Sequence, residues 1–271
     1  MPIIRGWFDE NRVYPWEEWD KAYYYNDKQG PKYKAYPLIE LLPRVRPDET
    51  DLYDTVGPVW ITDIDPYSNI GKVNARTEGA YIIDLPETFG CYIDSLEYDH
   101  RKKMRYSLRR NEDLSSKIDQ KEDIDVLWDD YIIKIQEFSM QDEGELYTPE
   151  RINLRKEFVK SSNTLTLSIY LKNDLIAVNV SKIENDTIYD LACMRRPDSE
   201  ILARGVGIYA SLLNIEHAIE KKYKFYDMLT DNFGYKTKFG AKEVKMRHFL
   251  KCDKKFAEIY DIDLNDVSIL I

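Results

Sequence analysis

Four side chains in the C-terminal half of the chain are of types that can catalyse group transfer: Asp190, Asp227, Tyr235 and Lys236. The two aspartates fall in segments with the mostly apolar pattern of strands, where a carboxylate is unusual and suits proton transfer. The tyrosine hydroxyl can protonate a leaving thiolate, and the lysine ammonium can stabilise an oxyanion or hold a carboxylate or phosphate. The structural alternative is a hydrogen-bonded strand carboxylate for each aspartate, a tyrosine packed under the sheet and a solvated lysine.

A glycine-containing turn lies between the two aspartates, at the start of a helix expected over Arg204 to Lys222. Glycines let a backbone approach a phosphate closely, and the first turn of a helix offers free N–H groups and a favourable dipole. Because a strand expected over Lys224 to Leu229 follows, the order indicates an enzyme that holds a pyrophosphate-bearing or phosphopantetheine donor. The alternative is an ordinary start of a helix. The candidate donor-binding residues are Arg204, Gly205, Val206, Gly207, Ile208 and Tyr209.

The composition is typical of a globular protein, with 271 residues of which 43% are hydrophobic and 32% charged. That length suits one large domain or two small ones that share a core. No apolar run approaches the roughly 20 residues that span a bilayer, and the first residues, MPIIRGWFDE, lack the basic and apolar regions of a signal peptide. We therefore expect a cytoplasmic protein.

Cysteine and histidine are sparse and scattered. The cysteines are Cys91, Cys193 and Cys252, which form no CxxC pair. Neither a disulfide framework nor a metal site is expected. Cys193 lies within an expected strand and has no legible partner base, so we interpret it as a small buried hydrophobe rather than a nucleophile.

The chain is acidic, with a formal net charge of -10 and a pI of about 5.0. Binding along a nucleic-acid backbone needs clustered positive charge, which the chain as a whole lacks. One basic run, HRKKMRYSLRR, extends from His100 to Arg110. It can contact the phosphates of a donor or an acidic carrier protein, and the alternative is a solvated helix face.

The expected elements alternate between strands and helices. Asn and Asp mark the turns of three closely spaced strands, which predicts an antiparallel meander. The expected strands are Pro58 to Asp63, Gly79 to Asp84, Thr164 to Leu171, Leu175 to Ile183, Thr187 to Arg195 and Val244 to Lys251. The expected helices are Tyr92 to Leu114, Asp123 to Met140, Pro149 to about Lys160 and a short helix or turn over Gly234 to Phe239.

The region before residue 92 is aromatic and repeatedly interrupted by prolines, which force extended or turning backbone. We therefore divide the chain into residues 1–91, an N-terminal aromatic-rich capping region, and residues 92–271, the core that carries the candidate residues. The first region is too short for a complete copy of such a core.

The order of meander, glycine-opened helix, strand, short helix and last strand resembles the core of the GNAT acyltransferases. The stretch from Leu165 to Gly240 resembles the acetyltransferase domain 6 branch of that superfamily, which is related to the Fem-type aminoacyltransferases. The residues that carry the resemblance are Phe225-Tyr226-Asp227, Tyr235-Lys236-x-x-Phe239-Gly240 and a basic linker helix with Arg105, Leu108, Arg109 and Arg110. The resemblance implies an α/β (α+β) fold, with a mixed, mostly antiparallel central sheet flanked by helices and a partial N-terminal GNAT-like or capping region.

The resemblance also implies a reaction: transfer of an acyl group from a thioester, acyl-CoA or an acyl carrier protein, to an amine of an amino acid, peptide or amino sugar. No metal and no covalent enzyme intermediate are expected. Asp227 is the favoured base because it falls in the matched strand, with Asp190 as the other candidate. One departure is Tyr209, which stands where the GNAT pyrophosphate signature has a small residue. The alternatives are a Fem-like transferase that uses aminoacyl-tRNA and a non-catalytic binding module of the same fold.

Overall fold

The computed structural model describes most of the C-terminal two thirds of the chain and short strands before it. The described residues are 3–4, 23–25, 33–35, 59–64, 72–73, 79–142, 149–160, 164–184, 186–229, 234–245, 247–259, 264, 267 and 269–270. Backbone contacts divide the chain into two compact units, Met1–Ala80 with Val244–Ile271, and Tyr81–Glu243. All candidate site residues therefore belong to the second unit.

The first unit is built on strands from both ends of the chain. Its main sheet has the order β1-β4-β13-β14, β5 also pairs with β13, and β2 and β3 form a separate antiparallel pair. A last strand of the core was expected over Val244 to Lys251. Most of that range forms β13, which pairs with β4 and β5 and does not join the core sheet. The elements are β1 (Ile3–Ile4), β2 (Tyr23–Tyr25), β3 (Tyr33–Ala35), β4 (Val59–Ile64), β5 (Lys72–Val73), β13 (Arg247–Cys252), α8 (Lys254–Ile259) and β14 (Ile269–Leu270).

The second unit is organised around a seven-stranded sheet with the order β12-β6-β11-β10-β9-β8-β7. The pair β10 and β11 is parallel, and the pairs β11–β6, β10–β9, β8–β9 and β7–β8 are antiparallel. This confirms the mixed, mostly antiparallel sheet. The strands are β6 (Ala80–Asp84), β7 (Leu114–Ile118), β8 (Thr164–Leu171), β9 (Asp174–Glu184), β10 (Thr187–Arg195), β11 (Phe225–Asp227) and β12 (Lys242–Val244).

The predicted meander is confirmed as β8, β9 and β10. Leu171 pairs with Asp174 across a turn in which Lys172 has a φ of 60°, and Thr187 pairs with Glu184 across the second turn. β-Branched and apolar side chains fill both faces of these central strands, since six successive residues of β8 are buried. The meander is therefore the rigid base of the unit.

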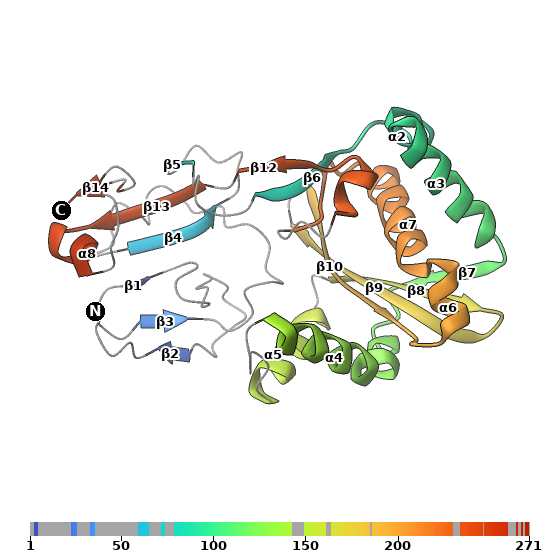
Figure 1. Ribbon diagram of the computed structural model, residues 1–271, viewed down its shortest axis with the longest axis horizontal. Helices are drawn as coiled ribbons and strands as arrows, with labels where there is room; N and C mark the ends of the chain where they lie inside the picture. The colour runs from blue at the N-terminus through green and yellow to red at the C-terminus, as the bar shows by residue number, and fades with distance from the viewer. Residues whose placement is uncertain are drawn as a thin grey trace. The chain divides into compact units, whose positions relative to one another are not determined.

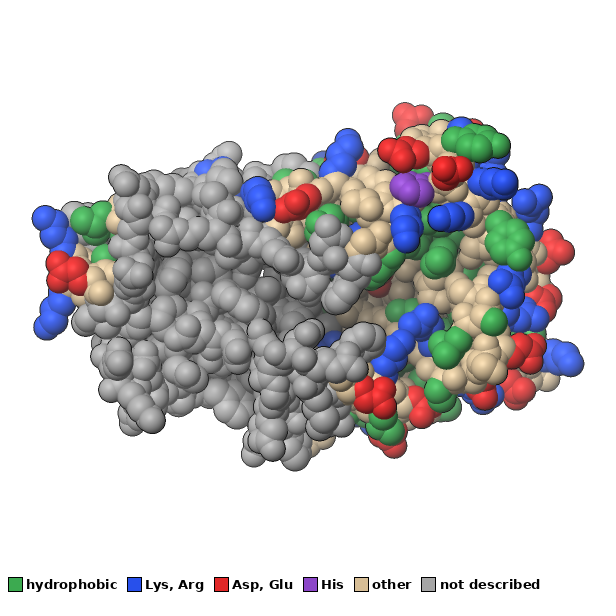
Figure 2. All heavy atoms as spheres, in the orientation of Figure 1, with side chains coloured by type: hydrophobic (Ala, Val, Ile, Leu, Met, Phe, Trp, Pro, Cys, Tyr) green, Lys and Arg blue, Asp and Glu red, His purple; other side chains and the backbone are tan. Residues whose placement is uncertain are grey.

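Helices cover both faces of this sheet (Figure 1). α7 packs on β8, β9 and β10 and also contacts α2 and α3, whereas α4 and α5 lie on the other face against β9 and β10. In the space-filling view, Lys and Arg side chains gather over the part of the surface where α3 lies (Figure 2). The helices are α2 (Phe89–Ser95), α3 (Tyr98–Arg110), α4 (Asp123–Asp142), α5 (Pro149–Val159), α6 (Ser199–Arg204), α7 (Val206–Glu220) and the 3-10 helix η2 (Lys236–Phe239).

The single helix expected over residues 92–114 is instead two helices followed by a strand. α2 begins after Thr88, whose side chain caps it by accepting from Cys91 N, and ends at Leu96, where the backbone turns extended with a ψ of 149°. α3 then starts anew, and β7 takes the end of the expected helix. The charged pattern continues across this break, so periodicity alone did not reveal it.

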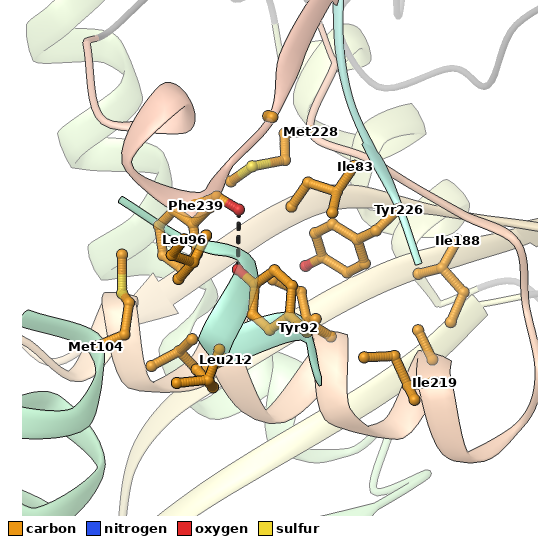
Figure 3. Packing of buried hydrophobic residues seen from close by; sticks show 14 of the residues in the cluster. Ile83, Tyr92, Leu96, Met104, Ile188, Leu212, Ile219, Tyr226, Met228 and Phe239 are labelled. Atoms are coloured by element: carbon orange, nitrogen blue, oxygen red, sulfur yellow. Dashed lines mark hydrogen bonds between the residues drawn. The ribbon is translucent and has the colours of Figure 1, made fainter. Parts of the chain in front are cut away.

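A core of buried aromatic and aliphatic side chains lies between α7, α2 and the sheet (Figure 3). Tyr92 Oη donates to the carbonyl of Phe239 at 2.9 Å, which fastens η2 to α2. Gly240 follows with a φ of 78°, and a Cβ there would lie 2.9 Å from Leu96 Cδ2. The Phe-Gly end of the Tyr-Lys-x-x-Phe-Gly element is thus structural, and it holds Tyr235 and Lys236 in place.

No helix among the described residues is long and apolar enough to cross a membrane. The described residues likewise contain no group of three or more His, Cys, Asp or Glu side chains placed to bind a metal ion.

Candidate functional site

The sheet opens between its two parallel strands. β10 pairs with β11 from Thr187 to Tyr189, but β11 ends at Asp227 while β10 continues to Arg195. The β9 register shifts between Asp190 and Ala192, where a bulge bends β10 and increases its twist. No described strand pairs with the β11 side of β10 beyond Tyr189. Asp190 therefore stands at the start of a free strand edge.

Alternation along the strands places the two candidate aspartates on opposite faces of the sheet. Ile188 pairs with Tyr226, and both belong to the apolar cluster under α7. Asp190, two residues after Ile188, shares that face, whereas Asp227, one residue after Tyr226, takes the other. Asp227 is buried, and its carboxylate accepts a hydrogen bond from Leu229 N at 2.7 Å.

Asp190 is held by an amide and has an altered acidity. Asn179 Nδ2 donates to its Oδ1 at 3.1 Å. Burial raises the pKa of Asp190, while the neighbouring groups Asn179, Tyr226, Lys236 and Ser211 oppose this rise in part. The result is a carboxyl that takes up a proton more readily than an exposed aspartate, which suits a group that accepts a proton during a reaction.

A buried polar network extends from Asp190 into helix α7. Asn214 Nδ2 donates to Asn179 Oδ1 at 2.7 Å and to Ser181 Oγ at 2.5 Å. Asn179, Ser181 and Asn214 are all almost fully buried. Sequence reasoning missed these residues, although the period-two spacing of Asn179 and Ser181 in an apolar strand was a signal. The network ties the orientation of Asp190 to the helix that begins at the glycine turn.

Tyr226 is a further residue that sequence reasoning did not select. Its side chain is 0% exposed, and its hydroxyl makes no hydrogen bond of standard geometry with a described residue. The ring lies in the middle of the apolar cluster (Figure 3). Burial, followed by the nearby charge of Asp190, raises the pKa of Tyr226 well above its usual value. A buried hydroxyl beside Asp190 is thus available as a neutral donor.

The structure brings Lys236 and Tyr235 to the same face as Asp190. Lys236 is only 3% exposed, and its Nζ lies 3.5 Å from the carbonyl of Leu229 and 5.6 Å from the ring centroid of Tyr81. Lys236 is therefore not a solvated lysine, and its charge acts on Asp190. Tyr235 is 40% exposed and meets Phe239 edge to face, so it is not packed under the sheet.

The glycine turn joins α6 to α7. Gly205 has a φ of 69° and ends α6, a left-handed conformation that favours glycine. Ile208 N and Tyr209 N donate to the Gly205 carbonyl at 3.0 and 3.3 Å. Within the described part of the chain, the amides of Val206 and Gly207 have no acceptor. Val206 is only 1% exposed, so the Gly207 N–H is the one that can meet an anion at the positive end of the helix.

The cation that lies against this helix start is Arg195 rather than Arg204. Arg204 Nη1 pairs with Asp113 Oδ1 at 2.8 Å, and this hydrogen bond lowers the pKa of the Asp113 carboxyl. Arg195, at the end of β10, packs on Gly207, where a Cβ would lie 3.0 Å from its Nη1. A side chain at position 207 would therefore press on this guanidinium, which would have to shift by a few tenths of an ångström. Nothing in the local pattern of Arg195 indicated this contact.

The aromatic side chain that replaces a small residue in the turn is part of the core. Tyr209 is 8% exposed and lies in a cluster with Leu114, Ile169 and Val206. Cys193 packs against the same cluster, and burial raises the pKa of its thiol to about 11. The thiol therefore stays protonated near neutral pH, in agreement with its interpretation as a small hydrophobe.

A mostly antiparallel sheet that opens at one parallel strand pair, with a glycine-started helix connecting the two parallel strands, has the element order of a GNAT-type acyltransferase core. The chain belongs to the GNAT acetyltransferase family, because the acetyltransferase (GNAT) domain matches residues 99–237, half of its length. No curated protein sequence matches the chain significantly.

Two solved structures are similar to the chain at low sequence identity. The crystal structure of FemX is 10% identical, with a TM-score of 0.55 over 74% of this chain and 73% of that one. The C-terminal domain of a putative lysylphosphatidylglycerol synthetase from Agrobacterium fabrum is 12% identical, with a TM-score of 0.40. That match covers 63% of this chain, which spans only 58% of the length of the other. The likeness to FemX supports the fold alone.

Proposed function

We propose that the protein is an N-acyltransferase that moves an acyl group from a thioester, acyl-CoA or an acyl carrier protein, to an amine. The observation that carries the proposal is the position of Asp190. Its carboxyl lies where β10 parts from β11, is oriented by Asn179 and is influenced by the buried cation of Lys236. A proton acceptor at a free strand edge is what attack of an amine on a thioester needs.

The donor would lie along the free edge of β10. A main-chain N–H of β10 would polarise the thioester carbonyl, as an oxyanion donor does in acyl transfer. The phosphates would sit at the start of α7 on the amide of Gly207, beside the guanidinium of Arg195. Among the other turn residues, Gly205 would set the left-handed backbone conformation of the turn. Ile208 and Tyr209 would continue the first turn of α7. Arg204, which pairs with Asp113, would add positive charge nearby.

In the transfer step the amine nitrogen attacks the thioester carbonyl carbon, a C–N bond forms and the C–S bond breaks. The carboxylate of Asp190 takes the proton that the amine loses, and Tyr235 gives a proton to the departing thiolate. Lys236 stabilises negative charge on the carbonyl oxygen or holds a carboxylate of the acceptor. Asp227 is the second candidate base, and its carboxylate already accepts from Leu229 N. The acceptor classes are an amino acid, a peptide and an amino sugar.

The proposal is tested by titrating the protein with acyl-CoA and with acyl carrier thioesters, and by following free thiol in the presence of a panel of amines. We expect saturable binding and amine-dependent release of thiol by the wild-type protein. The absence of both binding and thiol release with every donor would reject the proposal.

Fem-like transfer from aminoacyl-tRNA is the second candidate, and the shared fold with FemX favours it. A mobility-shift measurement with charged and uncharged tRNA at stated salt separates the two enzymes, because only the tRNA-dependent one binds the charged form selectively. A binding module without catalysis is the third reading, and loss of turnover on Lys236→Ala and Asp190→Asn with the fold intact would exclude it.

A further inference from the structure

One face of helix α3 forms a shallow surface groove rich in cations. Its lining residues recur at helical spacing, so they share one side of the helix, opposite the buried Ser107. Figure 2 shows Lys and Arg side chains with apolar ones between them in this part of the surface. The lining residues are Tyr98, Arg101, Lys102, Arg105, Leu108 and Arg109.

The cations of this groove fall into two groups. Arg105 pairs with Asp94 at 2.6 Å, and Arg101 donates to the Asp94 carbonyl at 3.0 Å, so both fasten α2 to α3. Lys102 and Arg109 are exposed and form no ion pair with a described residue. Like charges on successive turns of a helix repel one another, and folding alone does not require these two cations. They are available to an anionic partner.

The size and composition of the groove favour an acidic helix over a long polyanion. From Arg101 to Arg109 the helix rises roughly 12 Å, a short cationic track. A nucleic acid laid along it would continue onto the rest of a chain whose net charge is -10. Tyr98, at one end of the groove, is 71% exposed, and Leu108, toward the other end, is partly buried, so the groove offers apolar area for contact with a protein surface.

The end of this helix adjoins the turn where the donor's phosphates are proposed to bind. Asn111, the residue after α3, donates through Nδ2 to the carbonyl of Arg204 at 3.3 Å. Asp113 pairs with the Arg204 side chain. A partner docked on α3 therefore lies next to the start of α7, from which a flexible arm can enter the opening beside Asp190.

We propose that this groove of α3 docks an acidic helix of a small carrier protein that delivers the acyl group on a phosphopantetheine arm. The destination of the arm rests on the proposed function, but the docking itself does not. Carboxylates on successive turns of the carrier helix face Lys102 and Arg109, and the contact weakens as salt screens the charges.

The test measures binding of an acyl carrier protein in its apo form, which has no arm and so reports docking alone. The variant Lys102→Glu/Arg109→Glu reverses the charge of the two side chains that form no ion pair with a described residue. The matched control, Lys254→Glu/Lys255→Glu, makes the same change of charge at two exposed lysines of α8. We expect salt-sensitive binding by the wild type and the control, and about tenfold weaker binding by the α3 variant.

Three outcomes would overturn the docking proposal: no binding of the carrier at low salt, equal weakening by both variants, and tRNA bound through α3 in place of the carrier. The α3 variant should still release thiol from free acyl-CoA at the wild-type rate, since the altered residues lie outside the opening. If carrier binds through α3 but no thioester is turned over, docking stands and the proposed reaction fails.

Discussion

Asn179 binds Asp190 through its amide nitrogen at 3.1 Å and accepts from Asn214 through its amide oxygen at 2.7 Å. One side chain thus connects a carboxyl on β10 to a helix on the face of the sheet. Because each end of the amide is engaged, the orientation of Asn179 is determined, and so is the carboxylate oxygen that it binds. The neighbouring groups Tyr226, Lys236 and Ser211 also lower the pKa of Asp190 against the effect of burial.

Replacing Asn179 with alanine should shift the acid limb of the pH–rate profile of kcat/KM to higher pH. The hydrogen bond from Asn179 lowers the pKa of Asp190 against the larger effect of burial, so its loss raises that pKa further. Ser181→Ala is the matched control, because Ser181 lies opposite Asp190 across the strands but its hydroxyl bonds to Asn179 and Asn214. Both variants should lose about 1–3 kcal/mol of stability, but only Asn179→Ala should move the limb. If the acid limb lies at the same pH in the two variants, the result would contradict the role of Asn179 in positioning Asp190.

Asp190→Asn should stabilise the folded protein at neutral pH. Burial raises the pKa of Asp190 above its value in the unfolded chain. Its contribution to the free energy of unfolding is therefore full below the unfolded pKa, about 3.9, and is lost as the pH rises through the folded pKa. Urea unfolding of both proteins across this range measures the difference, with the exposed Asp129→Asn as the control for charge. A stability difference that does not grow with pH would contradict the raised pKa.

Three glycines with positive φ should respond unequally to alanine. Gly205 and Gly234 have φ values of 69° and 65° and open space around a Cβ, so each substitution should cost about 1 kcal/mol. Gly240 has a φ of 78° and faces Leu96 Cδ2 at 2.9 Å, and Leu96 is itself buried, so its cost should reach about 3 kcal/mol. Chemical denaturation gives the three values. Equal costs would contradict the close packing of the Tyr-Lys-x-x-Phe-Gly element, and Leu96→Ala should offset part of the Gly240 effect.

The sheet was predictable where its signals are local. The strands β8 to β10 are rich in β-branched and apolar residues, and Asn and Asp occupy their turns, so the meander follows from the chain alone. β7 was missed because LSSKI buries only its first residue and so lacks an apolar pattern. The break between α2 and α3 depends on Leu96, which is buried by tertiary contacts.

The site was predictable only in part, because its contacts are distant in sequence. Asn179 is 11 residues from Asp190 and 35 from Asn214, and only the strand register and helix packing bring them together. Alternation within a strand puts Tyr226 and Asp227 on opposite faces, but the sequence does not tell which face α7 covers. Arg195 was missed for the same reason, since it meets Gly207 only through the path from β10 to α7.

Arg195→Ala should weaken CoA binding about tenfold, whereas Arg204→Ala should weaken it less than about threefold. The Arg195 side chain packs on the first turn of α7, beside the Gly207 amide, which has no acceptor in the described part of the chain. Arg204 is engaged by Asp113, and an exposed pair of this kind contributes little. Calorimetric titration with CoA compares the two. The reverse order of effects would place the donor's phosphates on Arg204.

The central claim is tested most directly by measuring amine-dependent thiol release by the wild type, Asp190→Asn and Asp227→Asn. Both substitutions keep the size of the side chain and an oxygen that accepts a hydrogen bond, and they differ in the face of the sheet that they alter. A base at the opening predicts thiol release by the wild type, a loss of about a hundredfold or more in Asp190→Asn and near-normal turnover in Asp227→Asn. No thiol release by the wild type, or a loss confined to Asp227→Asn, would contradict acyl transfer at the free edge of β10.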